Sequence, residues 1–563
     1  MANNTEAGLP SPSAPTWQNW SGNLVHNPPT DGTKYYFAPT NLEELKQVVA
    51  DVAKVPGATV RVSGQRHSQT PLVINDNRGA VPQTTGEYLV DLSCYADLGA
   101  GQDQRLVLGP GENQVTLNAG VREDELDAFL TQHNLMMQTV TAGGFFSLGG
   151  MTAVNVHGAT ISAPIFAETV AAFSILLADG TVTTLDAQSA KVDGWSPLQF
   201  ARVSLGGLGI VTSLTLDVIS RPYTTTLQGS TERLGLADKS AFVAKYKTLL
   251  QNHTRVETFF TPYATDSVGF PLYAKNFLAL YWDVKDDPSP KTPNGPPNPD
   301  FLNACALASE QPPVYGAPYL QGFAKYGADA AQRAQYAVSP GNTISGVIQD
   351  GFDNPAVIAA VTFDVVEPEV ATANQAHSEL WLTGAVRVIF MSYYIPMPAI
   401  DDAGLGKVWD GLDVVSQIVL QDGNFHIAAP MEFRFVKGGD TAMSATFTED
   451  SENTWFINLD MIGFVEYDQS ARPQYSAKLL QFFADVERKW VEMGGFPHHG
   501  KMYGFYDPTD NSGQTATEPF NKNFMADLRR RRGARQQAYN AYRQQLDPNG
   551  LFSNAYLSQL LGS

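Results

Sequence analysis

Three short stretches of the chain place reactive side chains next to glycine. The first is VRVSGQRHSQTPLV (Val60–Val73), in which His67 follows a turn at Gly64. From its residue type alone, this histidine could cap a turn, bind a metal, act as a base or carry a covalent attachment. The other two stretches are VTAGGFFSLGGMTAVNVHGA (Val140–Ala159) and SLGGLGIVTS (Ser204–Ser213). Three glycine-centred turns so close together favour a large cofactor over ordinary tight turns.

The two later stretches do not contain the dinucleotide motif GxGxxG, and neither lies at a first strand-to-helix turn. A Rossmann-type site is therefore not expected. Glycines here can instead let the backbone approach a flat or phosphorylated ligand, with successive N–H groups forming a concave anion site.

A second candidate set lies in MEFRF, where Glu432 and Arg434 are two residues apart. If this segment is a strand, both side chains project to the same face. Buried together, they can form a hydrogen-bonded pair in which the guanidinium keeps the carboxylate ionised. A purely structural salt bridge on a sheet is the alternative.

No metal site is expected. His498 and His499 are adjacent, and adjacent residues on an extended segment point to opposite faces. No other carboxylate–histidine cluster has the spacing of metal ligands. The only two cysteines are Cys94 and Cys305, so the chain has neither a disulfide framework nor a zinc pattern.

Two amphipathic helices are expected beside the glycine stretches. In TNLEELKQVVADVAKVPG (residues 40–57), leucines and valines recur at helical spacing, and Thr40 with Glu43 is predicted to form a capping box. The second helix is expected over VREDELDAFLTQHNL (residues 121–135). Strands are expected at residues 58–62, 88–93, 114–120 and 210–219, with a hairpin around Asp179-Gly180.

The size and charge of the chain limit the classes of function that are expected. The chain has 563 residues, too many for one core, and a formal net charge of −20. The acidic balance argues against nucleic acid or an anionic membrane as partner. The run Arg529–Arg532 is interpreted as a solvated helix face, with a phosphate contact as the alternative. The insert Lys285–Asp300 is too rich in proline for helix or strand, so an exposed loop is expected.

The first residues, MANNTEAGLPSPSAPTW, show neither a basic region nor an apolar region of a signal peptide. The chain is therefore expected to be cytoplasmic, or a secreted protein written without its signal.

These motifs resemble the FAD flavoproteins of the vanillyl-alcohol oxidase type, and the resemblance covers essentially the whole chain. RVSGQRHS (Arg61–Ser68), SLGGMTAVNVHG (Ser147–Gly158) and GGLGIVTSLTL (residues 206–216) look like the three FAD loops of that family. The tail LDPNGLFSNAYL (Leu546–Leu557) is similar to the ending of its alditol and aldonolactone oxidases. PHHGK (Pro497–Lys501) resembles their HPHWGK segment, with His499 where tryptophan is usual.

Within the family, the closest resemblance is to the covalent-flavin, class II cholesterol oxidases. WQNWSG (Trp17–Gly22) is similar to their start, and Glu257, Glu432 and Arg434 match their active-site residues in order and approximate spacing. Glu-x-Arg also occurs in the alditol oxidases, whose substrates are small polyols.

The resemblance implies an α+β fold with two domains. Residues 1–222 and a C-terminal segment, 485–563, would form the FAD-binding domain. Residues 223–484 would form a substrate domain with a large antiparallel sheet and flanking helices. The site would lie at the domain interface. A monomer is expected.

The resemblance also implies the cofactor site. FAD would be bound covalently, its 8α-methyl group linked to His67, while His157 would lie beside it unlinked. The cofactor-binding residues would be Ser63, Gly64, Gln65, Arg66, His67, Ser68, Gly144, Ser147, Gly149, Gly150, Asn155, His157, Gly158, Gly209, Ile210 and Val211.

The expected reaction is oxidation of a secondary alcohol, the 3β-hydroxyl of cholesterol or a related sterol, with O2 reduced to H2O2. Glu432 would be the base or orient the base, Arg434 and Lys501 would stabilise the developing alkoxide, and Glu257 would line or gate the pocket. A carboxylate could also move a proton in a Δ5-to-Δ4 isomerisation. Contact with a membrane would be only transient, for extracting a sterol.

Three alternatives remain open at this point: an oxidase of polyols, sugars or aldonolactones on the same scaffold, a dehydrogenase with another electron acceptor, and a flavin-free binding protein.

Overall fold

The computed structural model describes most of the chain between residues 16 and 562. The described residues are 16–77, 86–221, 225–261, 275–286, 366–368, 370–371, 373, 388–421, 431–464, 475, 477–510, 512 and 515–562. Residues 287–300, nearly all of the proline-rich insert, lie outside them. No helix among the described residues is long and apolar enough to cross a bilayer.

The first layer is a three-stranded parallel sheet with β5 at its centre and helix α1 beside it. The helix spans Leu42–Val52, as predicted, and buries Leu45, Val48, Val49 and Val52. Its cap lies one residue later than predicted: the Asn41 side chain accepts from the Glu44 backbone N–H, and Glu44 reaches back to Thr40. Asn41 takes the cap because its short side chain reaches that N–H. The strands are β3 (Tyr36–Phe37), β5 (Glu87–Val90) and β4 (Thr59–Val62).

Next along the chain is a five-stranded antiparallel sheet in the order β10-β9-β11-β7-β6. The predicted hairpin is present: Val182 pairs with Leu176 across a turn in which Gly180 has φ +85° and Asp179 accepts from the Thr181 N–H. The strands are β6 (Leu106–Leu108), β7 (Gln114–Asn118), β9 (Val170–Leu176), β10 (Val182–Asp186) and β11 (Ile210–Asp217).

Short helices and strands connect these two sheets. Helix α2 confirms the second predicted helix. The elements are α2 (Glu123–Gln132), α3 (Leu148–Ala153), α4 (Pro197–Ala201), the 3-10 turn Phe166–Thr169, and the pairs β1 (Trp17–Gln18) with β2 (Val25–His26) and β8 (Leu135–Met136) with β12 (Ile219–Ser220).

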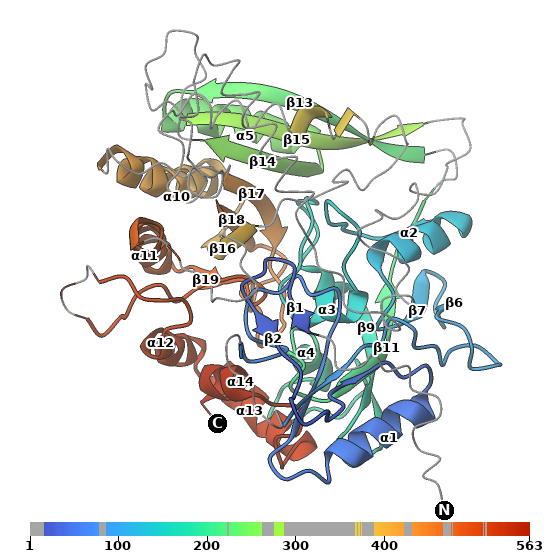
Figure 1. The fold of residues 1–563 in the computed structure, drawn as a ribbon. Coiled ribbons are helices and arrows are strands. Elements are labelled where there is room, and N and C mark those ends of the chain that lie inside the picture. Colours follow the sequence, from blue (N-terminus) through green and yellow to red (C-terminus); the bar gives the residue numbers. More distant parts are fainter. Residues whose placement is uncertain are drawn as a thin grey trace, which may run out of the picture.

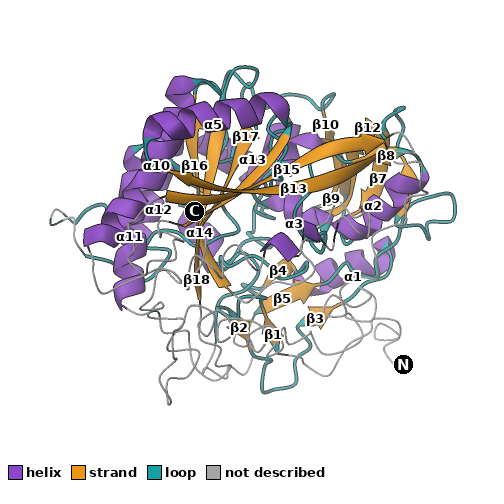
Figure 2. Cartoon of the chain, turned by 90° about the horizontal axis from the view of Figure 1, so that it is seen from above, coloured by secondary structure: helices purple, strands orange, loops and turns teal. Residues whose placement is uncertain are grey.

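A seven-stranded antiparallel sheet forms the upper part of the molecule in Figure 1. Helices α5, α10 and α11 lie side by side along one of its faces (Figure 2). In sheet order, the strands are β13 (Thr225–Leu236), β15 (Lys275–Asp286), β14 (Arg255–Thr261), β17 (Met431–Lys437), β18 (Trp455–Phe464), β16 (Val388–Met397) and β19 (Phe496–Pro497). The helices are α5 (Lys239–Asn252), α10 (Asp402–Gln421) and α11 (Ala477–Glu492).

The predicted strand MEFRF is β17, and its side chains alternate as expected. Phe433 packs against Phe242 and Tyr246 of α5, with ring centroids 6.2 and 5.5 Å away. Glu432 and Arg434 therefore project from the opposite face.

The C-terminal helices are α12 (Lys522–Arg532), α13 (Ala534–Leu546) and α14 (Ala555–Leu561). The Asp547 carboxylate accepts from the backbone N–H groups of Leu551 and Phe552, both at 2.8 Å. The Leu551 carbonyl then accepts from Val60 of β4. The tail therefore packs beside the N-terminal sheet, near α1 in Figure 1. The proposed domain boundaries remain predictions, and the one between residues 484 and 485 falls inside α11.

The arginine run is not a fully solvated helix face. Arg530 is exposed, but Arg532 is 3% exposed and buried. Phe524 and Leu528 lie four residues apart on the inward stripe of α12, and Arg532 is the next position on that stripe. It contacts the His499 ring, with Nη2 2.9 Å from Nε2.

Candidate active site

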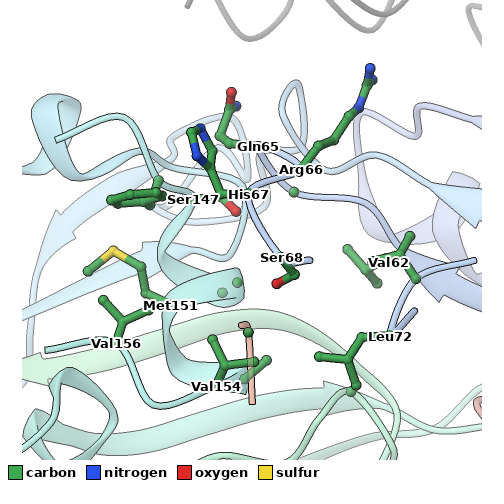
Figure 3. A pocket seen from close by; sticks show the side chains of 18 of the residues that line it. Val62, Gln65, Arg66, His67, Ser68, Leu72, Ser147, Met151, Val154 and Val156 are labelled. Carbon is green, nitrogen blue, oxygen red and sulfur yellow. The ribbon is translucent and has the colours of Figure 1, made fainter. Parts of the chain in front are cut away.

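A cavity of about 310 Å³ lies where the glycine stretches meet the large sheet. Residues of the three predicted FAD loops line it together, and Figure 3 shows part of this lining. Of the predicted cofactor residues, those at the cavity are Ser63, Gly64, Gln65, Arg66, His67, Ser68, Ser147, Gly149, Gly150, His157, Gly209, Ile210 and Val211. We call this wall the loop end of the cavity.

Gly144, Asn155 and Gly158 do not line this cavity, and each of them packs against another segment of the chain. The Gly144 carbonyl accepts from Asp124 of α2. The Asn155 side chain donates to Ser444 and accepts from the His499 backbone. A Cβ at Gly158 would lie 2.2 Å from the Val140 carbonyl oxygen.

Glycine is required at the loop end mainly so that the loops can pack against one another. A Cβ at Gly64 would lie 2.2 Å from Ser147 Oγ, and one at Gly120 would lie 1.9 Å from the Leu92 carbonyl oxygen. Gly209 has φ +143°, and its Cβ would meet Ile175 and Leu176. Each of these contacts would be with another atom of the protein, so the glycines are needed for close packing of the chain against itself.

Arg61 ties three distant segments to the loop end. Its buried guanidinium donates to the carbonyls of Leu72, Leu205, Gly206 and Phe552. Leu205 has φ +56°, a left-handed conformation that is costly for leucine. The first loop, the third loop and the C-terminal tail thus meet at one side chain.

The His67 ring lies among aromatic side chains. Trp20 and Phe145 stack on it, with centroids 5.1 and 4.9 Å away, and Phe146 meets it nearly edge-on at 4.7 Å. Burial, with a smaller effect of the Lys501 charge, holds the pKa of His67 well below 6.5. The imidazole is therefore neutral at pH 7.

A second part of the wall, which we call the sheet end, comprises Glu432, Arg434, Asp460 and Lys501. Arg434 forms ion pairs with Glu432 and, at 2.6 Å, with Glu257. Glu257 lies directly across from Arg434 in the β14–β17 register. It faces a small neighbouring recess rather than the main cavity.

Lys501 forms no ion pair within 4.0 Å among the residues that the structure describes. Its Nζ lies 3.6 Å from the centroid of the Phe390 ring. Burial lowers the pKa of Lys501 to about 8, while the charge of Asp460 opposes this shift and that of Arg434 adds to it.

His157 of the second loop and His498 lie next to the sheet end as neutral rings. Burial first, and then the Arg434 charge, lower the pKa of His157 to about 4. Its Nδ1 is 3.1 Å from the Gly158 carbonyl, which can only accept, so Nδ1 carries the proton. His498 Nδ1 accepts from the Gly500 N–H, and burial likewise holds the pKa of His498 well below 6.5.

His499 points away from the cavity, as expected for neighbours on an extended segment. Its Nε2 lies 2.9 Å from Arg532 and 3.2 Å from the Met443 carbonyl. His498, Gly500 and Lys501 form the wall instead. Among the described residues, no group of three or more His, Cys, Asp or Glu side chains could hold a metal ion.

Sequence reasoning missed Asp460. It is 5% exposed, pairs with Glu432 in the β17–β18 register and lines the cavity. A signal was present in WFINLDMIGF, where Asn458 and Asp460 share one face of an otherwise apolar strand. Phe145, Phe146 and Trp20 were also missed as neighbours of His67, because ring stacking leaves no trace in local spacing.

Two family models match separate parts of the chain. A model described as "FAD binding domain" matches residues 33–186, and one described as "D-arabinono-1,4-lactone oxidase" matches residues 357–560. The chain is 22% identical to L-gulonolactone oxidase of Bos taurus, over 97% of this chain and 98% of that protein.

It is also 22% identical to L-gulono-1,4-lactone dehydrogenase of Mycobacterium tuberculosis, over 98% of this chain and 100% of that protein. Among solved structures, a solvent-stable cholesterol oxidase superposes with a TM-score of 0.67 at 16% identity, covering 100% of both chains.

Proposed function

This chain belongs to the FAD flavoproteins of the vanillyl-alcohol oxidase type, with their two-domain fold, and on that premise we propose that it oxidises a secondary alcohol of a small polyhydroxylated lactone. It is a FAD-dependent oxidoreductase. The proposal concerns the substrate, the residues that act on it, the final electron acceptor and the mode of flavin attachment.

The residues at the loop end fit FAD. Residues of closely packed, glycine-rich loops line the cavity and leave room for a large flat group, and the cavity continues to charged side chains at the sheet end. When bound there, FAD supplies the acceptor for the hydride that leaves the alcohol carbon. The neutral imidazole of His67 lines the same wall, which supports its role as the covalent ligand of the flavin.

Glu432 is the residue that takes the hydroxyl proton, or orients the group that takes it. Its carboxylate faces the cavity and pairs with Arg434, which keeps it ionised and able to accept a proton. Arg434 is shared with Glu257, so the three side chains together carry one net negative charge. Such a group is better suited to accepting a proton than to stabilising an anion.

Lys501 stabilises the developing alkoxide more effectively than Arg434 does. Two carboxylates already offset the charge of Arg434, whereas Lys501 lies over the Phe390 ring and forms no ion pair among the described residues. A cation in a water-poor cavity interacts strongly with charge that develops on the substrate.

The charged side chains at the sheet end are the observation on which the proposed substrate rests. Glu432, Asp460, Arg434 and Lys501 face one space, and a lactone with several hydroxyls could pair with all of them. A sterol has one hydroxyl, so its ring system would desolvate the remaining charged groups without offering them partners. The relatives similar over nearly the whole chain carry names of lactone-oxidising enzymes, which points the same way.

A sterol such as cholesterol is the second candidate substrate, with isomerisation as a further step. In its favour, Met151, Val154, Val156 and Phe390 give part of the cavity an apolar wall. The likeness to cholesterol oxidase concerns the fold alone. For the acceptor, O2 is proposed, and the similarity to a dehydrogenase makes another acceptor the alternative.

The test is the visible spectrum of the purified protein under anaerobic conditions. L-gulono-1,4-lactone and D-arabinono-1,4-lactone are added in turn, with xylitol and detergent-dispersed cholesterol as comparisons. Bleaching by a lactone alone would support the proposal, and bleaching by cholesterol alone would overturn it in favour of the sterol. Admitting air then distinguishes the acceptors, because an oxidase recolours rapidly and releases H2O2.

A further inference from the structure

The His67 ring is contacted by two other parts of the chain, one 47 residues before it and one 78 residues after it. Trp20 comes from the turn after β1, and Phe145 and Phe146 come from the loop after β8. Trp20 is 4% exposed and Phe145 is 5% exposed. Both stacking rings are therefore fixed by the core rather than being mobile at the surface.

The N-terminal turn grips the backbone on both sides of His67. The Trp20 N–H donates to the Arg66 carbonyl at 2.8 Å, and the Asn19 side chain donates to the Ser68 carbonyl at 3.0 Å. Arg66 has φ +62°, a left-handed conformation that these bonds help to hold. Trp17 adds a bond from its indole N–H to Ser63 Oγ at 2.8 Å.

Helix α2 holds the loop that carries Phe145 and Phe146. The buried carboxylate of Glu123 accepts from both the N–H and the hydroxyl of Thr141. The Glu123 N–H donates to the Phe146 carbonyl at 3.0 Å. The loop that carries the two phenylalanines is thus anchored at both ends, independently of the N-terminal turn.

Two stacked neighbours fix the plane of the His67 ring. Trp20 and Phe145 stack within 24° and 27° of parallel, and Phe146 stands at 81°. The imidazole nitrogens lie on the edge, and His67 lines the cavity. A nitrogen lone pair lies in the ring plane, so fixing that plane also fixes the direction in which His67 can form a bond to a carbon in the cavity.

We propose that Trp20, Phe145 and Phe146 form an aromatic clamp that orients His67 for covalent attachment to the flavin, so that the clamp governs the rate of attachment rather than the affinity for FAD. The inference rests on the proposed covalent link. In that step, an imidazole nitrogen bonds to the 8α carbon, which gives up one C–H proton, and the imidazole gives up its N–H proton. The two electrons remain on the flavin until O2 accepts them and is released as H2O2.

The experiment uses full-length apoprotein produced in riboflavin-starved cells. FAD is added, and two quantities are followed: total bound FAD, by quenching of flavin fluorescence, and acid-stable flavin, by fluorescence of the denatured protein on a gel. The variants are Trp20→Leu and Phe145→Leu, which keep apolar bulk, and Trp20→Phe, which keeps an aromatic face. The Trp20 indole N–H has no hydrogen-bond partner among the described residues, so Trp20→Phe removes no such bond.

Phe129→Leu is the matched control, because its ring contacts His133 at 4.5 Å on α2, away from the cavity lining. We expect Trp20→Leu and Phe145→Leu to form acid-stable flavin about tenfold more slowly or worse, because misorientation of reacting groups has costs of this order. Trp20→Phe should stay close to the starting protein, and all variants should bind FAD with affinities within about twofold of it.

Unchanged attachment in Trp20→Leu and Phe145→Leu would overturn the clamp while leaving the covalent link intact. Loss of FAD binding itself would also overturn it, since the rings would then serve binding or folding. If the starting protein holds FAD with no acid-stable fraction, the covalent link and the clamp both fall. His67→Ala identifies the attachment residue, because it should bind FAD without any acid-stable product.

Discussion

At the loop end of the cavity, glycine-containing loops are packed closely together, whereas the sheet end carries four charged side chains. The loops approach so closely that a Cβ at Gly64 would lie 2.2 Å from Ser147 Oγ. At the sheet end, Glu432, Arg434 and Asp460 project from neighbouring strands, and Lys501 lies among them. Steric packing between loops therefore determines which residues fit at the loop end, whereas charge determines the properties of the sheet end.

The two ends of the cavity are also supported in the same way. Each is supported by a buried glutamate from a helix that accepts several hydrogen bonds: Glu123 binds Thr141 at the loop end, and Glu487 binds Tyr393, Gly504 and Phe505 at the sheet end. Burial raises the pKa of each to about 7. The comparison predicts that changes at the loop end alter flavin content and that changes at the sheet end alter chemistry.

The largest effect is expected from Glu432→Gln. It removes the proposed proton acceptor, so the rate of flavin reduction by substrate should fall by about 10²- to 10⁴-fold. Flavin content should not change. Anaerobic stopped-flow absorbance measures the rate. Asp410→Asn, which removes the exposed partner of Lys239, is the control. A full rate in Glu432→Gln would exclude the proposed role.

Gly64→Ala tests the loop end. The new Cβ would meet Ser147 Oγ at 2.2 Å, and overpacking of this kind costs about 1–3 kcal/mol. We expect less bound flavin and a lower Tm, both measured on the purified protein. Gly235→Ala is the control, since its Cβ would find Asn276 at 3.6 Å.

A double variant sharpens this test. In Gly64→Ala with Ser147→Ala, the nearest remaining Ser147 atom would be the Cβ at 3.5 Å, an ordinary contact. Flavin content should recover in this variant. No recovery would mean that Gly64 is needed for backbone freedom or for the cofactor rather than for packing between loops.

Glu487→Gln tests the support behind the sheet end. The pKa of Glu487 is about 7 in the folded protein against an ordinary 4.5, so the folded state holds this proton more tightly than the unfolded state. Its contribution is complete below the ordinary pKa and is lost as the pH rises through about 7. The free energy of unfolding should decline over this window by roughly 1–3 kcal/mol through Glu487.

Urea unfolding at a series of pH values measures this slope. In Glu487→Gln, the part of the pH-dependent decline in unfolding free energy that is due to Glu487 should disappear. The part due to Glu123 should remain. An unchanged slope would show that Glu487 does not titrate in this range.

The smallest effect is expected from Asp460→Asn. The negative charge of Asp460 favours the ammonium form of Lys501, whose pKa is about 8. If charged Lys501 stabilises the alkoxide, flavin reduction should slow as the pH rises through about 8. In Asp460→Asn this decline should move lower by about one pH unit. A rate that instead rises through this range would make Lys501 a base.

Local sequence determined much of this protein. Spacing of leucine and valine predicted α1, the Asp179-Gly180 turn predicted its hairpin, and alternation placed Glu432 and Arg434 on one face. Each depends on residues only a few positions apart, because helical and strand periods and turn conformations are short-range properties. The resemblance of the three loops to FAD-binding segments predicted the cofactor.

Only the tertiary structure brought Asp460 beside Glu432, Trp20 onto His67, and Arg532 into the core next to His499. It also put Glu257 across from Arg434, 177 positions away in sequence. Such pairings depend on strand register, on how two sheets meet and on which helix stripe turns inward. These are set by burial of the whole chain at once, so no short window of residues contains them.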